Sequence, residues 1–101
     1  MKVVLTEQSL LSLQETFEFL LSQSNISKQR ANSILKAVLD RTEELKVYPQ
    51  LGQIEELLSH LRLGHRRLIE GHIKIIYRVE GETVYITDFF DSRQDPKKMK
   101  P

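Results

Sequence analysis

Basic and aromatic side chains alternate through the C-terminal third of the chain, and their types suit phosphodiester chemistry on RNA. Cleavage through the 2′-hydroxyl requires a base for that proton, cations for the developing charge and an acid for the leaving oxygen. Arg67 and Lys74 are predicted to form a cross-strand pair of cations. Arg78 is predicted to lie beside Tyr85, and Phe89 to offer a surface on which a base can stack.

A complete acid and base pair is not evident among these side chains. Arginine stays protonated, because its pKa lies above about 12. Lys74 could act as a base only if its pKa were lowered, and Tyr85 is the remaining hydroxyl on that face. Two interpretations stay open: these residues hold a phosphate, or they form a solvated face that grips an acidic protein partner.

Histidine and cysteine usage argues against a metal centre. His60, His65 and His72 have spacings that place no two of them on one helical face, and no metal-binding motif surrounds them. Cysteine is absent, which removes disulfides, thiol nucleophiles and thiolate zinc sites. We therefore expect neither a metal nor a cofactor, and we expect a cytoplasmic location.

Length and composition are typical of one soluble domain spanning residues 1–101. A chain of 101 residues can bury roughly two-thirds of its unfolded surface, and its apolar runs are too short to span a membrane. The net charge is only +1, but residues 60–78 hold five basic side chains and only one acidic side chain, Glu70. Their basic side chains are Arg62, Arg66, Arg67, Lys74 and Arg78. This segment suits a phosphate backbone or an acidic partner.

Three runs rich in β-branched and aromatic residues, at 66–69, 73–79 and 83–90, predict a three-stranded antiparallel meander. Two glycine-centred turns, at 70–71 and 81–82, separate them. Two-residue loops would set the register, in which directly paired residues share a face. The expected pairs are Ile69 with His72, Arg67 with Lys74, Glu80 with Thr83, and Arg78 with Tyr85.

This register predicts one apolar and one mixed face. The expected core face carries Leu68, Ile73, Ile75, Tyr77, Val79, Val84, Ile86 and Phe90. The other face carries Arg67, Ile69, Lys74, Ile76, Arg78, Tyr85, Thr87 and Phe89. The assignment depends on the turns, because a loop one residue longer introduces a bulge or flips a strand.

The first half of the chain predicts a short strand and a helical hairpin. Residues 2–5 are the expected strand, and Thr6 is the expected N-cap of a helix from Glu7 to about Ser22. Its apolar stripe comprises Leu10, Leu13, Phe17, Leu20 and Leu21. Ser27 should cap a second helix that ends near Val47, because Pro49 follows. The second stripe comprises Ala31, Ile34, Leu35, Val38, Leu39, Thr42 and Leu45.

The expected fold class is α+β, with an N-terminal strand, a helical hairpin and the meander, and with the helices packed on one face of the sheet. The opposite face should stay exposed. Residues 53–63 allow two interpretations, a helix or a strand start near Gln53 followed by a loop. After Asp95-Pro96, the lysines at 97, 98 and 100 predict a basic, frayed C-terminus.

Three motifs occur in a characteristic order: YPQLG at 48–52, IIYRV at 75–79 and DSRQDP at 91–96. With the leading strand and helical hairpin, they resemble the RelE/ParE superfamily, the toxins of type II toxin–antitoxin modules. The resemblance covers nearly the whole chain. It implies a small α+β toxin that is held inactive by a cognate antitoxin wrapped around it.

The resemblance implies different site residues for the two branches of the superfamily. In the ribonuclease branch, basic residues on the central strands hold and polarise the phosphate, and the matching positions are Arg67, Lys74 and Arg93. That branch usually has a Tyr or His near its C-terminus, and residues 93–101 contain neither. The ending is more similar to the ParE-like, or plasmid-stabilisation, branch, which poisons DNA gyrase. Whether the chain is an enzyme stays open.

Three functions are therefore considered. The preferred one is a ParE-like toxin that acts on DNA gyrase; the alternatives are a RelE-like ribosome-dependent mRNA endoribonuclease and a non-toxic protein-binding module of the same fold. The expected partners are a cognate antitoxin and either gyrase or ribosome-bound mRNA, without a membrane, and a homodimer is open. Expected target-binding residues are Arg66, Arg78, Tyr85 and Phe89.

Overall fold

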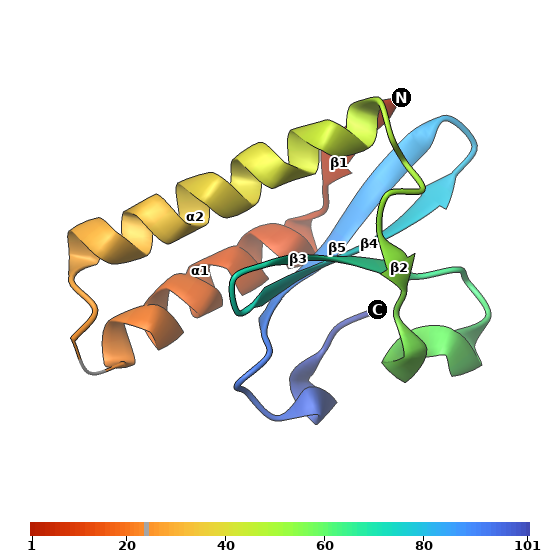
Figure 1. The fold of residues 1–101 in the computed structure, drawn as a ribbon. Helices are drawn as coiled ribbons and strands as arrows, with labels where there is room; N and C mark the ends of the chain where they lie inside the picture. The colour runs from red at the N-terminus through yellow and green to blue at the C-terminus, as the bar shows by residue number, and fades with distance from the viewer. Residues whose placement is uncertain (24) are drawn as a thin grey trace.

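A computed structural model, which describes residues 1–23 and 25–101, places two helices on one face of a mixed sheet (Figure 1). The elements are β1 (Lys2–Leu5), α1 (Glu7–Ser22), α2 (Lys28–Glu43), η1 (Glu44–Lys46), β2 (Gln53–Ile54), η2 (Glu56–Leu61), β3 (Arg66–Glu70), β4 (Ile73–Glu80), β5 (Thr83–Asp91) and η3 (Pro96–Lys98), where η marks a 3-10 helix. The strand order is β1-β5-β4-β3-β2. The expected α+β class is confirmed, and β2 adds a fifth strand to the expected four.

Both helices begin at the predicted caps. The Thr6 hydroxyl accepts a hydrogen bond from the backbone N–H of Ser9 at 3.1 Å, and Ser27 does the same for Arg30 at 3.0 Å. The second helix continues as η1 and ends at Lys46, as the following Pro49 predicts. Its predicted stripe is buried or partly buried against the sheet. Within the described residues, no helix is long and apolar enough to cross a membrane.

The buried face of α1 is more polar than its apolar spacing predicts. Leu10 and Leu21, which belong to the predicted stripe, are exposed. Leu20 is buried as predicted, but the other fully packed positions of this helix are Ser9, Ser12 and Thr16. Small hydroxyl side chains therefore lie where the sequence periodicity predicts larger apolar ones.

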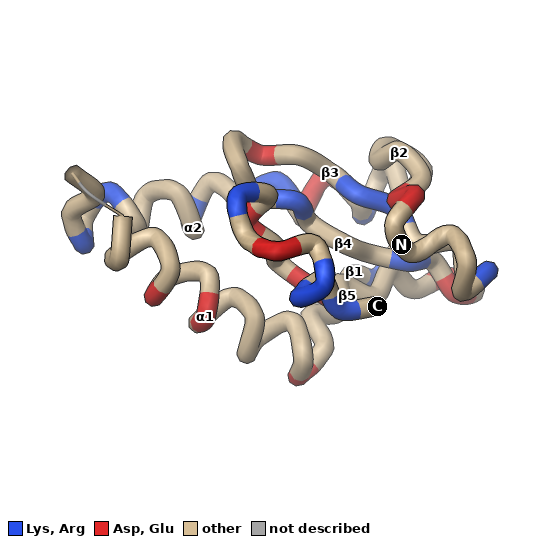
Figure 2. Tube along the Cα trace, turned by 90° about the horizontal axis from the view of Figure 1, so that it is seen from below, with Lys and Arg blue, Asp and Glu red and all other residues tan. Residues whose placement is uncertain are grey.

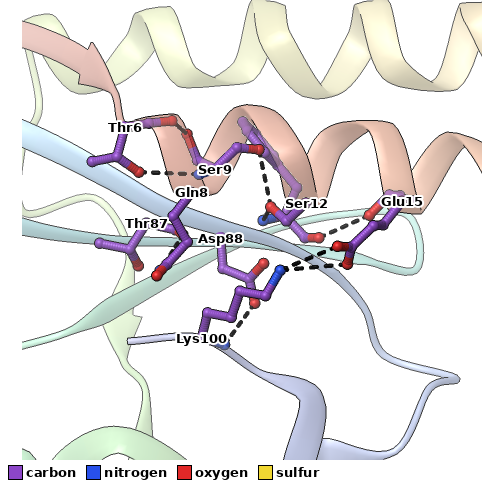
Figure 3. Close-up of polar contacts among 10 residues, drawn as sticks. Thr6, Gln8, Ser9, Ser12, Glu15, Thr87, Asp88 and Lys100 are labelled. Atoms are coloured by element: carbon purple, nitrogen blue, oxygen red, sulfur yellow. Dashed lines mark hydrogen bonds and ion pairs between the residues drawn. The ribbon is translucent and has the colours of Figure 1, made fainter.

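These hydroxyl side chains bind backbone groups of β5 that no strand pairs with. Strand β1 is parallel to β5 and ends opposite Ile86, so within the described part of the chain the rest of β5 has no neighbouring strand on that side. The Thr87 carbonyl accepts a hydrogen bond from Gln8 Nε2 at 3.0 Å (Figure 3). The Phe89 N–H donates to Ser12 Oγ at 2.9 Å. Thr16 Oγ1 donates to the Phe89 carbonyl at 2.8 Å. Helix α1 thus takes the place of a strand there.

The first hairpin of the meander differs from the predicted register. Ile69 pairs with Lys74 rather than with His72, because the turn is formed by Gly71 and His72. Gly71 has a φ of +61°, which favours glycine at this turn. The pairing moves by two residues, so every side chain of β3 keeps its predicted face.

The second hairpin begins as predicted and then departs from the register. Pairing of Glu80 with Thr83 and of Arg78 with Tyr85 is confirmed. A bulge follows, since Ile76 pairs with Asp88 whereas Tyr77 pairs with Ile86. Thr87 is the extra residue, and its insertion reverses the faces of the rest of β5.

This reversal exchanges the two phenylalanines at the end of β5. Phe89 is only 2% exposed and belongs to the core under the helices, together with Ile75 and Leu20. Phe90 lies on the opposite face, in a smaller apolar cluster with Leu58, Ile76 and Met99. The prediction that Phe90 is a core-face residue and Phe89 an exposed one is therefore wrong.

The face opposite the helices is not open, contrary to the prediction. Segment η2 and the C-terminal residues both lie on that side of the sheet (Figure 1). The predicted frayed C-terminus is also wrong, because the Lys100 N–H donates to Asp88 Oδ2 at 2.9 Å and Met99 is buried (Figure 3). Of the two interpretations for residues 53–63, a strand start at Gln53 is confirmed, and η2 follows it.

Candidate functional site

Glu55 joins the basic side chains of two neighbouring strands. Its Oε1 accepts a hydrogen bond from Lys74 Nζ at 2.9 Å, and its Oε2 lies 3.7 Å from Arg67 Nη1. The carboxylate also caps η2, because Oε2 accepts the Leu57 N–H at 3.2 Å. Glu55 is 1% exposed, whereas about a fifth of the side chains of Arg67 and Lys74 is exposed. Two of the predicted catalytic cations therefore converge on an anion that belongs to the chain.

Sequence reasoning missed Glu55. The residue follows a strand of only two residues, and no spacing relates it to Lys74, which lies 19 positions later. Pairing of β2 with β3 brings it to the sheet, where the Glu55 N–H donates to the His65 carbonyl at 2.9 Å. The available signal is a pair of adjacent carboxylates, Glu55 and Glu56, just before the basic segment 60–78. Figure 2 shows acidic positions among the basic positions of this part of the molecule.

The adjacent arginines on β3 hold β2 in place from opposite faces of the strand. Arg67 Nη1 donates to the Ile54 carbonyl at 2.6 Å, and Arg66 Nη1 donates to the Gly52 carbonyl at 2.7 Å. Tyr77 completes the attachment of this turn, since its hydroxyl accepts the Gly52 N–H at 2.8 Å. Arg66, a predicted target-binding residue, therefore has a structural partner.

The third predicted catalytic cation, Arg93, lies in a separate cluster. Its Nε and Nη2 donate to the two carboxylate oxygens of Asp91 at 3.0 and 2.8 Å, and its guanidinium lies 5.7 Å from the centre of the Phe19 ring. Burial alone would raise the pKa of Asp91, but the hydrogen bonds and charge of Arg93 hold that pKa below its ordinary value. The structure thus unites Arg67 with Lys74 and places Arg93 elsewhere.

Arg78 and Tyr85 form the predicted neighbouring pair. The guanidinium of Arg78 lies 5.5 Å from the centre of the Tyr85 ring, and its Nη1 donates to Glu80 Oε2 at 2.7 Å. Phe89 is not available beside them, because it lies in the core. His65 is also buried; burial and the charge of Arg78 lower the pKa of His65. Neither ring nitrogen of His65 has a hydrogen-bond partner among the residues that the structure describes.

Two further titratable groups lie in fixed positions. Burial raises the pKa of Tyr77, whose hydroxyl donates to the Pro49 carbonyl at 2.9 Å. Burial also raises the pKa of Asp88, although hydrogen bonds from Lys100 and Ser12 oppose that effect. Among residues 1–23 and 25–101, no three His, Asp or Glu side chains are placed to share a metal ion.

An open groove of about 570 Å³ separates the helical hairpin from the turn between β3 and β4. Its apolar part includes Ile26, Ile34 and Ile73, and its charged lining consists of Arg30, Arg93, Glu70 and Asp91. Apolar floors with a few charged groups are typical of sites that receive side chains of a partner. The groove could not be predicted from the sequence, because its walls come from the helical hairpin, residues 70–73 and residues 91–93, which are far apart along the chain.

Comparison with known proteins agrees with this architecture. Residues 3–96 match a family model described as the ParE toxin of the type II toxin–antitoxin system parDE. A solved structure titled "Chromosomal ParDE TA system from P. aeruginosa" has a similar fold, with a TM-score of 0.71 and 17% sequence identity. The similarity covers 88% of this chain and 92% of that chain. No curated protein matches the sequence.

Proposed function

Because the chain belongs to the ParE toxin family of type II toxin–antitoxin systems, we propose that it arrests growth by binding DNA gyrase and that a cognate antitoxin neutralises it. The observation that carries the proposal is the family match over residues 3–96. The C-terminal residues support it, because 93–101 hold neither the Tyr nor the His expected of an RNA-cleaving toxin. The target and the neutralisation are the steps to be tested.

The pairing of charges supports action by binding rather than by chemistry. Lys74 and Arg67 share the buried Glu55, and Arg93 is bound by the fully buried Asp91. A catalytic role for these residues would first require the loss of internal ion pairs.

The groove beside α2 supports the proposed antitoxin partner. It is open and contains Ile26, Ile34 and Ile73, and its charged residues are Arg30, Glu70 and the ion pair of Arg93 with Asp91. An amphipathic segment with an apolar anchor would complement the isoleucines, and an acidic residue of that segment would complement Arg30. We propose that part of the antitoxin binds there.

Controlled expression in bacteria tests this function. Induction of the wild-type chain should arrest growth with DNA breaks that depend on gyrase, and coexpression of the protein encoded by the adjacent gene should restore growth. A harmless wild-type chain would contradict the proposal and would favour the non-toxic binding module. Arrest without gyrase-dependent breaks would exclude gyrase as the target.

One observation favours the RelE-like alternative. Arg67 and Lys74 approach a single carboxylate, and two cations with that geometry could also hold a phosphate. Under this alternative, Arg67, Lys74 and Arg93 would contact ribosome-bound mRNA. Mapping transcript ends after induction tests it, since new 5′ ends in phase with codons are its expected product. An unchanged set of 5′ ends would exclude it.

A further inference from the structure

Segment η2 and the residues that follow it hold three exposed leucines. Leu57, Leu61 and Leu63 are 50%, 37% and 56% exposed. Single exposed leucines are common in soluble proteins, but three within seven residues concentrate apolar surface on one short segment. Arg62 is exposed among them. We call these four residues the η2 tip.

The η2 tip lies apart from the groove beside the helical hairpin. Segment η2 is next to the end of β3 that begins with Arg66, whereas the groove is lined by Glu70, at the other end of β3 (Figure 1). A partner at the η2 tip would therefore leave the groove accessible.

The η2 tip is anchored on the sheet. Between the exposed leucines, Leu58 is only 6% exposed and belongs to the cluster with Ile76, Phe90 and Met99. At the start of the segment, the buried Glu55 accepts the Leu57 N–H at 3.2 Å. A surface that is already ordered loses little conformational entropy when it binds a partner, which favours affinity.

Arg62 has an unusual backbone conformation. Its φ of +57° and ψ of +31° belong to the left-handed region, which residues other than glycine rarely adopt. The Arg62 N–H donates to the Ser59 carbonyl at 3.1 Å. No ion pair of the Arg62 side chain is found among residues 1–23 and 25–101. Strained conformations of this kind concentrate at functional sites, where the surrounding structure compensates for them.

The neighbouring arginines of β3 are engaged within the chain. Arg66 Nη1 donates to the Gly52 carbonyl at 2.7 Å, and Arg67 Nη1 donates to the Ile54 carbonyl at 2.6 Å. Arg62 is thus the arginine of this region whose charge remains available to another molecule. A guanidinium group binds a carboxylate or a phosphate well, because both accept two parallel hydrogen bonds.

The apolar side chains of the η2 tip favour a protein over a nucleic acid. Protein–nucleic acid interfaces are polar and strongly basic, whereas the centres of protein–protein interfaces are apolar and enriched in arginine. Three leucines around one arginine match the second kind of interface. The complementary surface would have an acidic side chain beside apolar pockets.

We infer that the η2 tip is the surface through which this toxin contacts its protein target. The inference rests on the proposed function for the identity of the target, DNA gyrase. The place of contact rests on the exposed leucines and on the unpaired, left-handed Arg62.

Arg62→Gly tests the contact without straining the fold. Glycine adopts the left-handed conformation readily, so the variant keeps the turn and removes only the side chain. Leu63→Ala removes apolar surface from the same tip. Leu11→Ala is its matched control, because Leu11 on α1 is also 56% exposed. The probe is purified DNA gyrase, binding is measured by calorimetry, and thermal unfolding verifies that each variant is folded.

We expect Arg62→Gly to weaken gyrase binding by about tenfold or more and Leu63→Ala by about fivefold, since a few central side chains contribute most of the affinity of an interface. Leu11→Ala should change the affinity by less than about twofold. Arg62→Gly and Leu63→Ala should still bind the protein encoded by the adjacent gene as tightly as the wild-type chain does, because the groove is unchanged.

The possible results separate the inference from the proposed function. Wild-type affinity for gyrase in both variants would overturn the inference and leave the toxin function intact. A wild-type chain that does not bind gyrase would overturn the proposed function, and the inference with it.

Three further results would assign the η2 tip to another partner and would also overturn the inference. Weaker binding of the adjacent gene product, with gyrase binding unchanged, would place the antitoxin there. Dimers of the isolated chain that Leu63→Ala abolishes would place a second copy there. Binding of the isolated chain to duplex DNA that Arg62→Gly abolishes would place a nucleic acid there.

Hydrogen exchange provides a readout that does not depend on the variants. In the wild-type chain, the amides of residues 57–63 should exchange more slowly when gyrase is bound than when the chain is free. Unchanged exchange across these residues in the gyrase complex would overturn the inference even if a variant fails to fold.

Discussion

Lys74 Nζ lies 2.9 Å from the Oε1 atom of Glu55, a carboxylate that is almost completely buried between β3 and β4. Lys74 is one of the positions that the resemblance to the ribonuclease branch predicts to hold a phosphate. Here an internal anion occupies that place, and it also caps η2. The Glu55 side chain therefore has two roles. It neutralises positive charge on β3 and β4, and it attaches the segment after β2 to the sheet.

This relationship predicts a large loss of stability for Lys74→Met. The variant would leave the Glu55 carboxylate buried, with Arg67 at 3.7 Å as its remaining cation. Removal of one partner of a buried pair costs about 3 to 5 kcal/mol, and the partial exposure of Lys74 places the expected loss at the lower end. The measurement is urea unfolding at pH 7. The control is Lys36→Met, which breaks the exposed pair with Asp40 and should change the free energy of unfolding by less than about 0.5 kcal/mol. Equal losses of stability in the two variants would refute the structural role of Glu55.

The pair of Asp91 and Arg93 predicts a stability that depends on pH. Arg93 holds the pKa of Asp91 below its ordinary value of 3.8, so the ionised pair stabilises the fold above that pH. The contribution should be lost as the pH falls through the lowered pKa. Arg93→Met should therefore be most destabilising at neutral pH, and its difference from wild type should shrink in acid. A difference that stays constant from pH 7 to pH 3 in urea unfolding would contradict this prediction.

The contribution of Asp88 to stability should depend on pH in the opposite direction. Its pKa is raised, mainly by burial, so its neutral form favours folding and this contribution is lost as the pH rises above 3.8 and through the raised pKa. Asp88→Asn stays neutral and keeps an oxygen that can accept the Lys100 N–H. The variant should therefore gain stability relative to wild type as the pH rises from 4 to 7. Thermal unfolding across this range tests the sign, and a relative loss with rising pH would show that Asp88 is stabilised as an anion.

The turn before β2 has no room for a side chain at position 52. A Cβ atom there would lie 2.5 Å from the Arg67 carbonyl oxygen and 2.7 Å from the Tyr77 hydroxyl. Gly52→Ala should destabilise the fold by about 1 to 3 kcal/mol, because backbone atoms would have to move. Gly64→Ala is the control, since a Cβ at Gly64 meets nothing within 4 Å and only its φ of +76° opposes the change. Equal or smaller destabilisation by Gly52→Ala, measured by urea unfolding, would contradict the close packing of this turn.

The local elements of the fold could be predicted from the sequence. Thr6 and Ser27 cap the two helices as expected, because capping depends on residues only three positions away. The meander and its second turn were predicted for the same reason, since β-branched runs and glycine turns are local signals. The predicted cationic pair of Arg67 and Lys74 lies on one face, although the two residues are not direct partners.

Features that depend on distant contacts could not be predicted. The bulge at Thr87 leaves no mark in a sequence where Phe89 and Phe90 are adjacent and either could enter the core. Glu55 reaches the basic strands only through pairing of β2 with β3. The buried Ser12 and Thr16 are explained by the edge of β5, and their spacing alone does not reveal that partner.

Supercoiling of relaxed plasmid by purified DNA gyrase tests the central claim most directly. Addition of the purified wild-type chain should inhibit supercoiling and produce cleaved DNA, and prior addition of the protein encoded by the adjacent gene should prevent both effects. Heat-denatured chain is the control for non-specific inhibition. Full supercoiling without cleaved DNA, from a chain that arrests growth in cells, would contradict gyrase as the target.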